Sequence, residues 1–326
     1  MKLKPGKLPP EFLNDLIQGL VLHREVTIGP GIGFDSAVID LGDKFLVVTS
    51  DPITFVTEDI GYYTVAVNIN DVAVTGAEPA FMTLTVLIPE KGMDLSGIKK
   101  VFEDVREVAS EYGISIVGGH TEVSPGIENI VTSATMIGFA DKDELVRQDG
   151  ARPGDIVVMA GFAGVEATSI IARELDLRKY FTEDEISEMK NFYKNPGIVI
   201  LERVRCLKRY ARPTAMHDPT EGGVAQAIHE LAVASDVGFL IESDRIPVHP
   251  YTTRLSQILD FDPLGIISSG SLIATVKPED VSRIHCPDTW IIGKVVDKSG
   301  GVKMIHGGKV TELPEYPQDE ITRILD

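Results

Sequence analysis

The chain has 326 residues, of which 43% are hydrophobic and 25% are charged, close to the averages of folded soluble proteins. These proportions exclude a disordered chain, a collagen-like repeat and a coiled coil, and the length predicts two domains. The 31 basic and 49 acidic residues give a net charge of −18, so long-range attraction to nucleic acid or to an anionic membrane is disfavoured. Small phosphates held by backbone N–H groups and a divalent metal stay compatible with this charge.

Cysteine usage and hydropathy predict a cytoplasmic location. The chain has two cysteines, Cys206 and Cys286, without CxxC or zinc-ligand spacing, so we expect a reducing compartment and interpret both as structural. The basic residues 1–12 have no apolar core behind them, and no apolar run is long enough to cross a bilayer.

The first half of the chain alternates between patterns typical of strands and of helices. Apolar and β-branched runs predict a hairpin over residues 37–41 and 45–50, a buried helix over 58–75, and strands over 80–88, 114–117 and 130–139. Apolar residues at helical spacing predict a helix over 95–112, which Gly113 would end.

The polar segment 141–155 has little periodicity, and we place the domain boundary there. It separates a first domain over 1–145 from a second over 155–326. In the second, we predict a strand over 156–160, helices from Val165 and over 183–193, 197–210 and 222–234, and short strands from Ile266 onward. Both halves mix strands and helices, so the fold class is α/β or α+β.

A glycine-rich loop, residues 28–35 (IGPGIGFD), is the first candidate ligand-binding segment. Its glycines, Gly31 and Gly33 among them, let the backbone approach a phosphate closely, although an ordinary turn is equally compatible. The loop is not a dinucleotide fingerprint, because a hairpin follows it instead of a helix. Asp35 and Asp51 flank the two strands of that hairpin, and converging carboxylates are what magnesium needs when it also holds nucleotide phosphates.

The predicted buried helix carries polar residues in an otherwise apolar sequence. Asn68, Asp71 and Thr75 share one face. Burial of an unpaired carboxylate costs several kcal/mol or more, so Asp71 should meet a cation, a metal or several hydrogen-bond donors. A helix-terminal or internally satisfied aspartate is the alternative.

Two glycine-containing segments follow predicted strands. Residues 118–122 (GGHTE) would form a turn at a strand end, where His120 could donate to a phosphate or transfer a proton. In the second half, residues 215–223 (AMHDPTEGG) precede a helix, so Thr220 and Gly222 would place donors at its N-terminus, a natural anion site. Simple N-capping by Asp218 or Thr220 is the alternative. The basic cluster 203–212 is interpreted as a solvated helix face.

Together these segments resemble a known superfamily, that of aminoimidazole ribonucleotide synthetase (PurM), selenophosphate synthetase and thiamine-monophosphate kinase, and within it the hydrogenase expression/formation proteins (HypE). The matching segments follow the order of the family along nearly the whole chain: Gly33–Val38, Thr49–Asp51, Ile69–Ala77, Gly118–Glu122 and Met216–Val224.

The resemblance implies a two-domain, PurM-like fold in which the N-terminal sheets of two subunits pair in a homodimer and the second domain is a mixed sheet flanked by helices. It implies that ATP and Mg bind in the cleft, and that the γ-phosphoryl group of ATP is transferred. Asp35, Asp51 and Asp71 would hold the metal, and His120 and Asp218 are the catalytic candidates. The expected nucleotide-binding residues are Gly31, Gly33, Asp35, Asp51, Asn70, Asp71, Gly118, Gly119, Thr121, Thr220 and Gly222.

The chain departs from the HypE pattern at several positions. HypE-type proteins end in a cysteine whose thiol carries the carbamoyl group, whereas this sequence ends Arg323–Asp326. Phe34 replaces an aspartate, Glu221 replaces an arginine, and the NEG-like turn of the second domain reads Ser268–Gly270. We therefore expect changed acceptor chemistry with nucleotide binding retained.

Three functions follow from these observations. The first is a HypE-like enzyme that activates an amide or carbonyl oxygen, on a small molecule or a protein, by phosphorylation. The second is a kinase of the thiamine-monophosphate type. The third is a dimeric, non-catalytic nucleotide-binding protein that contacts a maturation partner protein.

Overall fold

The computed structural model describes residues 8, 10–54, 56 and 58–325, and these form two compact units. Unit 2 comprises Val21–Pro30 and Asp35–Leu145. Unit 1 comprises the described residues up to Leu20, the short segment Gly31–Phe34 and the chain from Val146 onward. The chain therefore leaves unit 1, returns to it for four residues, and leaves again before unit 2 is complete.

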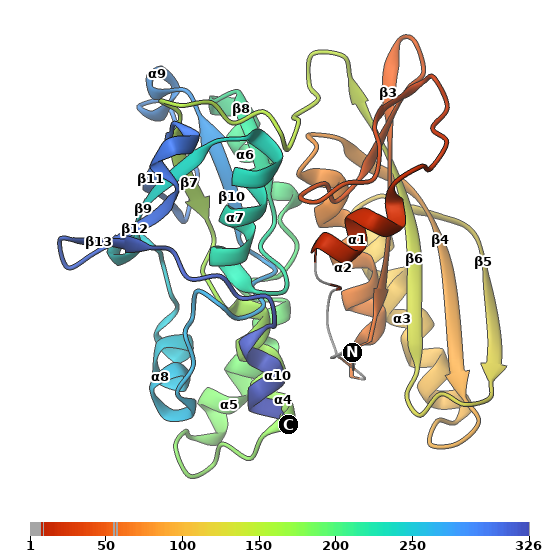
Figure 1. Ribbon diagram of the computed structural model, residues 1–326. Helices are drawn as coiled ribbons and strands as arrows, with labels where there is room; N and C mark the ends of the chain where they lie inside the picture. Colours follow the sequence, from red (N-terminus) through yellow and green to blue (C-terminus); the bar gives the residue numbers. More distant parts are fainter. Residues whose placement is uncertain (1–7, 9, 55, 57, 326) are drawn as a thin grey trace. The chain divides into compact units, whose positions relative to one another are not determined.

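Unit 2 is built on a six-stranded sheet with the order β1-β2-β3-β6-β4-β5 (Figure 1). Neighbouring strands are antiparallel except for β4 and β5, which are parallel. Its elements are β1 (Val26–Ile28), β2 (Ala37–Asp40), β3 (Lys44–Ile53), α2 (Ile60–Ala73), β4 (Glu78–Pro89), α3 (Leu95–Glu111), β5 (Ser115–Ser124) and β6 (Val131–Asp141).

The helix α2 lies between this sheet and α3, which explains its apolar sequence. It contacts β3, β4 and β6 on one side and α3 on the other, and all of its residues are buried. The two helices approach closely at Gly61, where a Cβ atom would lie 2.3 Å from the carbonyl oxygen of Val101. The helix α3 is amphipathic, and its N-cap, Asp94, accepts a hydrogen bond from the amide of Gly97.

Unit 1 is built on a seven-stranded mixed sheet with the order β13-β12-β9-β11-β7-β10-β8, in which only β12 and β9 pair in parallel. Its strands are β7 (Ile156–Ala160), β8 (Pro213–His217), β9 (Gly238–Glu242), β10 (Leu272–Val276), β11 (Thr289–Val296), β12 (Val302–His306) and β13 (Lys309–Glu312). Its helices are α1 (Pro10–Ile17), α4 (Val165–Glu174), α5 (Glu183–Lys190), α6 (Leu201–Tyr210), α7 (Gly223–Ser235), α8 (Pro250–Leu259), α9 (Pro278–Val281) and α10 (Glu320–Leu325).

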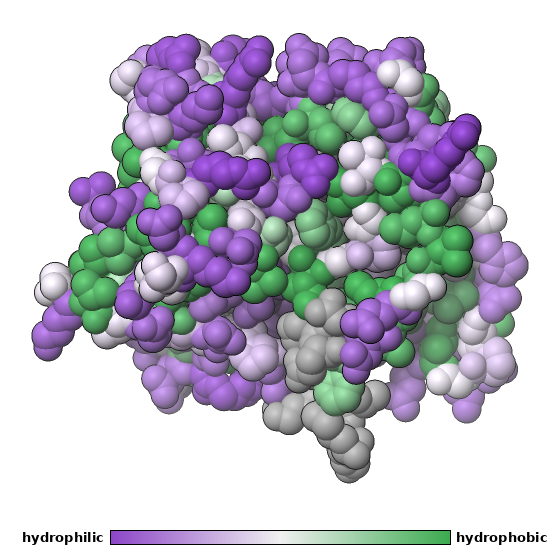
Figure 2. Space-filling model, turned by 45° about the horizontal axis from the view of Figure 1, so that its top comes forward, coloured by the Kyte–Doolittle hydropathy of each residue, from purple (hydrophilic) through white to green (hydrophobic). Residues whose placement is uncertain are grey.

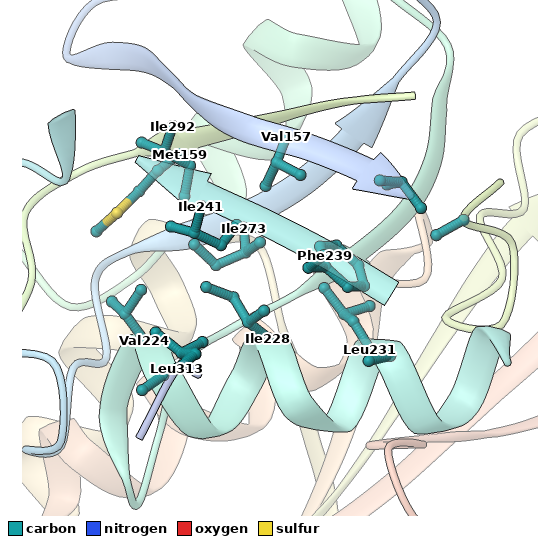
Figure 3. Packing of buried hydrophobic residues seen from close by; sticks show 14 of the residues in the cluster. Val157, Met159, Val224, Ile228, Leu231, Phe239, Ile241, Ile273, Ile292 and Leu313 are labelled. Atoms are coloured by element: carbon teal, nitrogen blue, oxygen red, sulfur yellow. The ribbon is translucent and has the colours of Figure 1, made fainter. Parts of the chain in front are cut away.

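The core of unit 1 lies between this sheet and α7. Val224, Ile228 and Leu231 extend from α7 toward strand residues such as Phe239 and Ile273, and all five are fully buried (Figure 3). A second apolar cluster joins α4, α5, α8 and α10. The mixed sheet flanked by helices confirms the predicted fold class.

Cys206, on α6, and Cys286, in the loop before β11, form a disulfide bond. The cysteines are structural, as expected, but the bond between them was not anticipated. The cysteine count therefore no longer argues for a reducing compartment.

Several predicted elements differ from the structure in position. Residues 250–259, with proline as the first residue, form α8, which was not predicted. The predicted helix over 197–210 begins only at Leu201, and the helix over 58–75 begins at Ile60 and ends at Ala73.

No helix among the described residues combines the length and the apolar composition needed to cross a membrane. Figure 2 shows hydrophilic side chains spread over much of the face in view, with apolar residues between them. This pattern is ordinary for a folded chain, because large charged side chains are seldom buried.

Candidate functional site

The buried aspartate of α2 lies against β3 in unit 2. Asp71 is 4% exposed, and its Oδ2 accepts a hydrogen bond of 2.7 Å from the hydroxyl of Thr49. The same hydroxyl lies 2.9 Å from the carbonyl oxygen of Asp35, and Ser36 donates to the carbonyl oxygen of Asp71. Thr49, which the sequence analysis overlooked, therefore joins the segments that carry two of the predicted metal ligands.

Asp51, the third of these aspartates, does not follow β3 but lies within it, opposite Ala134 of β6. The predicted strand end at Ser50 is therefore wrong. On its other edge β3 pairs with β2 only as far as Val48, so the N–H of Asp51 is free to bond the side-chain oxygen of Asn68 at 3.2 Å. Asn68 and Asp71 are one turn apart on α2, and both face β3, as their spacing predicted.

The segment Gly118–Glu122 also lies within a strand, so the predicted turn is wrong. These residues belong to β5, which pairs with β4 at the edge of the sheet and is exposed along nearly all of its length. At Gly119 a Cβ atom would lie 1.9 Å from the carbonyl oxygen of Leu84, so glycine permits close pairing here. His120 is exposed and lies 3.0 Å from Glu122.

The side chain of Glu122 is held in its ionised form. The hydroxyl of Ser124 and the ring of His120, in that order, lower the pKa of Glu122. Thr121 is exposed in the same strand, and Asn70 is fully buried in α2, where its carbonyl oxygen accepts from Val74.

In unit 1, turns rich in glycine and serine meet at the N-terminal ends of α4 and α7. The amide of Gly164, which precedes α4, donates to the hydroxyl of Ser268, and that hydroxyl donates to the carbonyl oxygen of Ile266. At Gly223, the first residue of α7, φ is 64°, and a Cβ atom would lie 2.6 Å from that same carbonyl oxygen. Glycine is required here by backbone conformation and by space.

The N-terminus of α7 does not present the donor expected from Gly222. The amide of Gly222 donates to Oδ2 of Asp319 at 2.7 Å. Neither Asp218 nor Thr220 caps the helix: Gly222 occupies the N-cap position without a side-chain hydrogen bond, and the carbonyl oxygen of Thr220 accepts from Gly223. The proposed anion site therefore loses one of its two expected donors to an aspartate nearly a hundred residues away in sequence.

Asp218 and its neighbour His217 are both 1% exposed. Nε2 of His217 lies 2.8 Å from Oε2 of Glu230 on α7, which fixes the ring, and Nδ1 lies 3.9 Å from Asp218. The histidine–glutamate pair was not predicted, because its members lie thirteen residues apart in sequence, one at the end of β8 and the other on α7.

A buried glutamate that the sequence analysis overlooked lies in the first turn of α4. Burial raises the pKa of Glu166 from 4.5 to about 7. The hydroxyl and amide of Ser269 oppose this rise, and the carboxylates of Asp319 and Asp218 add to it. Burial likewise raises the pKa of Asp319 to about 6, although the amides of Ile321, Gly222 and Ile267 donate toward it.

One member of the basic cluster differs from the predicted solvated face. Arg203, on α6, is partly buried and donates from Nε to the carbonyl oxygen of Gly270 at 3.0 Å. Burial lowers the pKa of its guanidinium, and Asp288 opposes this shift.

Gly31 and Gly33 belong to the short segment that returns to unit 1. At Gly33 φ is 78°, and a Cβ atom would lie 2.8 Å from the carbonyl oxygen of Glu230 on α7. The predicted ligand residues thus fall into two groups: Asp35, Asp51, Asn70, Asp71 and residues 118–121 in unit 2, and Gly31, Gly33, Asp218, Thr220 and Gly222 in unit 1.

Comparison with known proteins identifies the family. Residues 33–140 match the N-terminal domain, and residues 152–305 the C-terminal domain, of AIR synthase related proteins. The chain belongs to this family. A putative hydrogenase expression/formation protein of Methanocaldococcus jannaschii is 34% identical over 319 residues, which cover 94% of this chain and 91% of the relative. The carbamoyl dehydratase HypE of Rhizobium leguminosarum bv. viciae is 29% identical over 299 residues, which cover 86% and 83%.

Solved structures of AIR synthase related proteins share the fold. AaThiL complexed with AMPPCP and TMP aligns with a TM-score of 0.75 at 24% identity, over 94% of this chain and 96% of that one. HypE in complex with ATP aligns with a TM-score of 0.67 at 22% identity, over 95% and 91%. HypE from the HypE–HypF complex aligns with a TM-score of 0.69 at 23% identity, over 85% and 92%. The resemblance inferred from the motifs is confirmed.

Proposed function

We propose that this AIR synthase related protein is an ATP- and Mg-dependent enzyme that activates an amide or carbonyl oxygen by phosphorylation. The γ-phosphoryl group would pass from ATP to that oxygen, which releases ADP. The phosphorylated oxygen would then leave as phosphate. HypE relatives that are carbamoyl dehydratases, and related structures that contain ATP or AMPPCP, support this proposal.

The observation that carries the proposal is the buried carboxylate of Asp71. Burial of a carboxylate in an apolar helix costs several kcal/mol unless partners or a cation compensate its charge. The structure connects Asp71 through Thr49 to Asp35, while Asn68, one turn earlier on α2, holds Asp51. Hydrogen bonds thus connect Asp35, Asp51 and Asp71 with neighbouring residues of β3 and α2 in unit 2.

The donor set fits magnesium. Mg²⁺ takes oxygen ligands and in nucleotide sites uses one or two carboxylates together with phosphate oxygens. Asp35, Asp51 and Asp71 supply oxygen ligands only, and a bound metal would supply positive charge where negative charge develops on the transferred phosphoryl group. Thr49 would orient Asp71, because its hydroxyl donates to Oδ2 of that carboxylate.

The candidate acid–base groups lie in both units. His120, exposed on β5 beside Glu122, could transfer a proton, and Asp218, buried in unit 1, is the second catalytic candidate. The acceptor would be a small molecule or a group on another protein.

Calorimetric titration with Mg-ATP tests nucleotide binding. We expect binding that requires the divalent metal and disappears with EDTA. An absence of binding heat with every divalent metal tested would reject both enzyme functions.

Asp71→Asn tests the metal-ligand assignment. The amide keeps the shape but removes the charge, so we expect phosphate release from Mg-ATP to fall by at least about 100-fold. Asp143→Asn, at an exposed position of the same unit, is the matched control and should keep wild-type turnover. Unchanged turnover in Asp71→Asn would exclude Asp71 as a metal ligand.

The reaction products separate the remaining alternatives. A dehydratase leaves free phosphate and ADP, whereas a kinase leaves a phosphorylated acceptor. The kinase alternative has support from a thiamine-monophosphate kinase of Bacillus subtilis that is 28% identical over 253 residues. Binding of Mg-ATP without either product, over a panel of primary amides and thiamine monophosphate, would favour the non-catalytic alternative.

The quaternary structure and location belong to the same proposal. We expect a homodimer through the sheet of unit 2, whose edge strand β5 exposes Ile116, Val117 and Val123 by 42%, 58% and 60%. A maturation partner protein is supported by the HypE–HypF complex, and a cytoplasmic location is part of the same proposal. Sedimentation equilibrium tests the dimer: a monomer at micromolar concentration would reject it.

A further inference from the structure

One face of the sheet in unit 1 is crossed by a short connection between two strands. Both β10 and β11 pair antiparallel with β7, which lies between them, so β10 and β11 run parallel to each other. The connection that joins them, residues 277–288, therefore crosses one face of β7. We call it the crossover segment. Such connections usually contain a complete α-helix, whereas the helix in this one, α9, has four residues.

The crossover segment lies on the side of the sheet opposite α7. Val157 and Met159 belong to the core between the sheet and α7, so Val158, which lies between them in β7, points to the other face. Between Val158 and the crossover segment is a cavity of about 610 Å³. Its apolar lining includes Val158, Ile246, Val281, Ile284, Trp290 and Ile291. This volume and this lining are typical of the sites that bind small molecules.

The walls of the cavity are held in place on two sides. The indole ring of Trp290 packs against the ring of Phe162, with a distance of 5.3 Å between the ring centroids. The crossover segment is joined to α6 by the disulfide bond between Cys206 and Cys286. Ile291 is 40% exposed, so a ligand can reach the cavity from the solvent.

Two of the polar side chains that line the cavity already have partners. Oδ1 of Asp244 lies 2.8 Å from Nδ1 of His306, and Oδ2 accepts from the amide of Gly307 at 3.0 Å. The hydroxyl of Thr289 donates to the carbonyl oxygen of Pro287. Neither side chain offers an uncommitted charge to a ligand.

Arg245 also lines the cavity and retains hydrogen-bond donors. Its Nε lies 2.7 Å from Oε2 of Glu242, and among the described residues this is its one ion pair. The terminal guanidinium nitrogens therefore keep N–H groups for a ligand. A guanidinium group binds a carboxylate through two parallel hydrogen bonds, so the polar part of the cavity suits an anion.

We propose that this cavity binds a small aromatic carboxylate. The aromatic ring would lie against Trp290 and the aliphatic side chains of Ile284 and Ile291, and the carboxylate would bind Arg245. None of the residues predicted to bind nucleotide or metal lines the cavity. The proposal therefore concerns a second ligand site and does not rest on the proposed function.

The fluorescence of Trp290 provides a direct measurement, because the chain has one tryptophan. The probe is 4-nitrobenzoate, whose nitroaromatic ring quenches indole fluorescence on contact. Its comparison compound, 4-nitrobenzamide, has a similar shape without the charge. We expect 4-nitrobenzoate to quench the fluorescence of the full chain in a saturable manner, and the amide to bind at least about tenfold more weakly.

Three variants test whether the probe binds in this cavity, and circular dichroism checks that each is folded. Arg245→Gln should weaken the binding of 4-nitrobenzoate by at least about tenfold and leave that of the amide unchanged. Arg323→Gln is the matched control: Arg323 pairs with Glu320 at the same spacing and is 53% exposed, against 55% for Arg245, so affinity should be kept. Ile291→Glu places a second negative charge in the cavity and should abolish binding.

Three results would overturn the proposal. One is quenching of the wild type that rises linearly with probe concentration without saturation. Another is an equal affinity for the acid and the amide, or an affinity for the acid that Arg245→Gln leaves unchanged. The third concerns the alternative occupant, a second copy of the chain: if no probe binds and Ile291→Glu abolishes self-association in sedimentation velocity, this face is an interface between copies. The titrations contain no nucleotide, so their result is independent of the proposed function.

Discussion

Acidic residues in this chain serve different physical purposes. Asp94 caps a helix, and Asp319 accepts from main-chain amides. Asp59, Asp236, Asp260 and Asp288 adopt positive φ angles, a conformation that aspartate tolerates better than most residues. Asp71 and Glu166 share none of these purposes, because each is buried in a helix that needs no acid for its own formation.

Glu166 makes the stability of unit 1 depend on pH. Its pKa is about 7 in the folded chain and 4.5 ordinarily, so between these values the folded state binds more protons than the unfolded state. The free energy of unfolding therefore falls as the pH rises from about 4.5 to 7 and then levels off. At roughly 1.4 kcal/mol per unit of pKa, the penalty above pH 7 is on the order of 3 kcal/mol.

Glu166→Gln should remove this penalty. We expect the variant to unfold at higher urea than the wild type at about pH 8, and at similar urea at about pH 5. Asp319, whose pKa is also raised, is present in both proteins. A difference that does not change with pH would show that Glu166 does not titrate in this range.

At the scale of elements, β5 depends on a glycine that the sequence analysis assigned to a ligand-binding turn. At Gly119 any side chain would meet the carbonyl oxygen of Leu84 at 1.9 Å, whereas at Gly118 the nearest atom is 3.9 Å away. We expect Gly119→Ala to break the pairing of β5 with β4 and to destabilise unit 2 by about 1–3 kcal/mol, as overpacking does elsewhere. Gly118→Ala is the matched control and should have little effect.

Hydrogen exchange would localise this change to β4 and β5, and urea unfolding would give its size. If both alanine variants lose the same stability, the close approach to Leu84 is not what requires glycine.

The elements that the sequence predicted well are those that local periodicity determines. The helix α3 was predicted over 95–112 and spans Leu95–Glu111, because one apolar face packs against α2 and a glycine follows. In contrast, β5 was misread, because two adjacent glycines and polar residues are typical of a turn and the pairing that overrides this pattern comes from β4. The helix α8 was overlooked, although Tyr251, Leu255, Ile258 and Leu259 follow helical spacing.

The candidate site was predictable only where the local sequence reveals a residue in an unusual environment. A carboxylate in an apolar helix is visible in the sequence, so Asp71 could be singled out. Glu166 could not, because an acid in the first turn of a helix is ordinary. What distinguishes it is its burial near Ser269 and Asp319, which are a hundred residues or more away in sequence.

At the scale of the whole molecule, the disulfide bond makes the stability of unit 1 depend on redox conditions. Cys206 and Cys286 are 80 residues apart, so the bond restricts a long loop of the unfolded chain. We expect reduction, or the double variant Cys206→Ser with Cys286→Ser, to lower the free energy of unfolding of unit 1 by about 2–4 kcal/mol. Hydrogen exchange should show faster opening of β7 and β10 and unchanged protection of β3 and β6.

Free thiols counted before and after reduction provide the control, because the oxidised protein should expose none. Identical urea midpoints with and without reductant would mean that the bond does not contribute to stability.

The described residues up to Leu20 belong to unit 1, although the rest of that unit is synthesised much later. The described residues up to Leu20 and the segment Gly31–Phe34 pack with a chain that begins only at Val146. On the ribosome, the strands of unit 2 are all available once residue 145 has emerged, and domains generally form as units during translation. The described residues up to Leu20 can therefore join their own unit only after the chain beyond Val146 has been made.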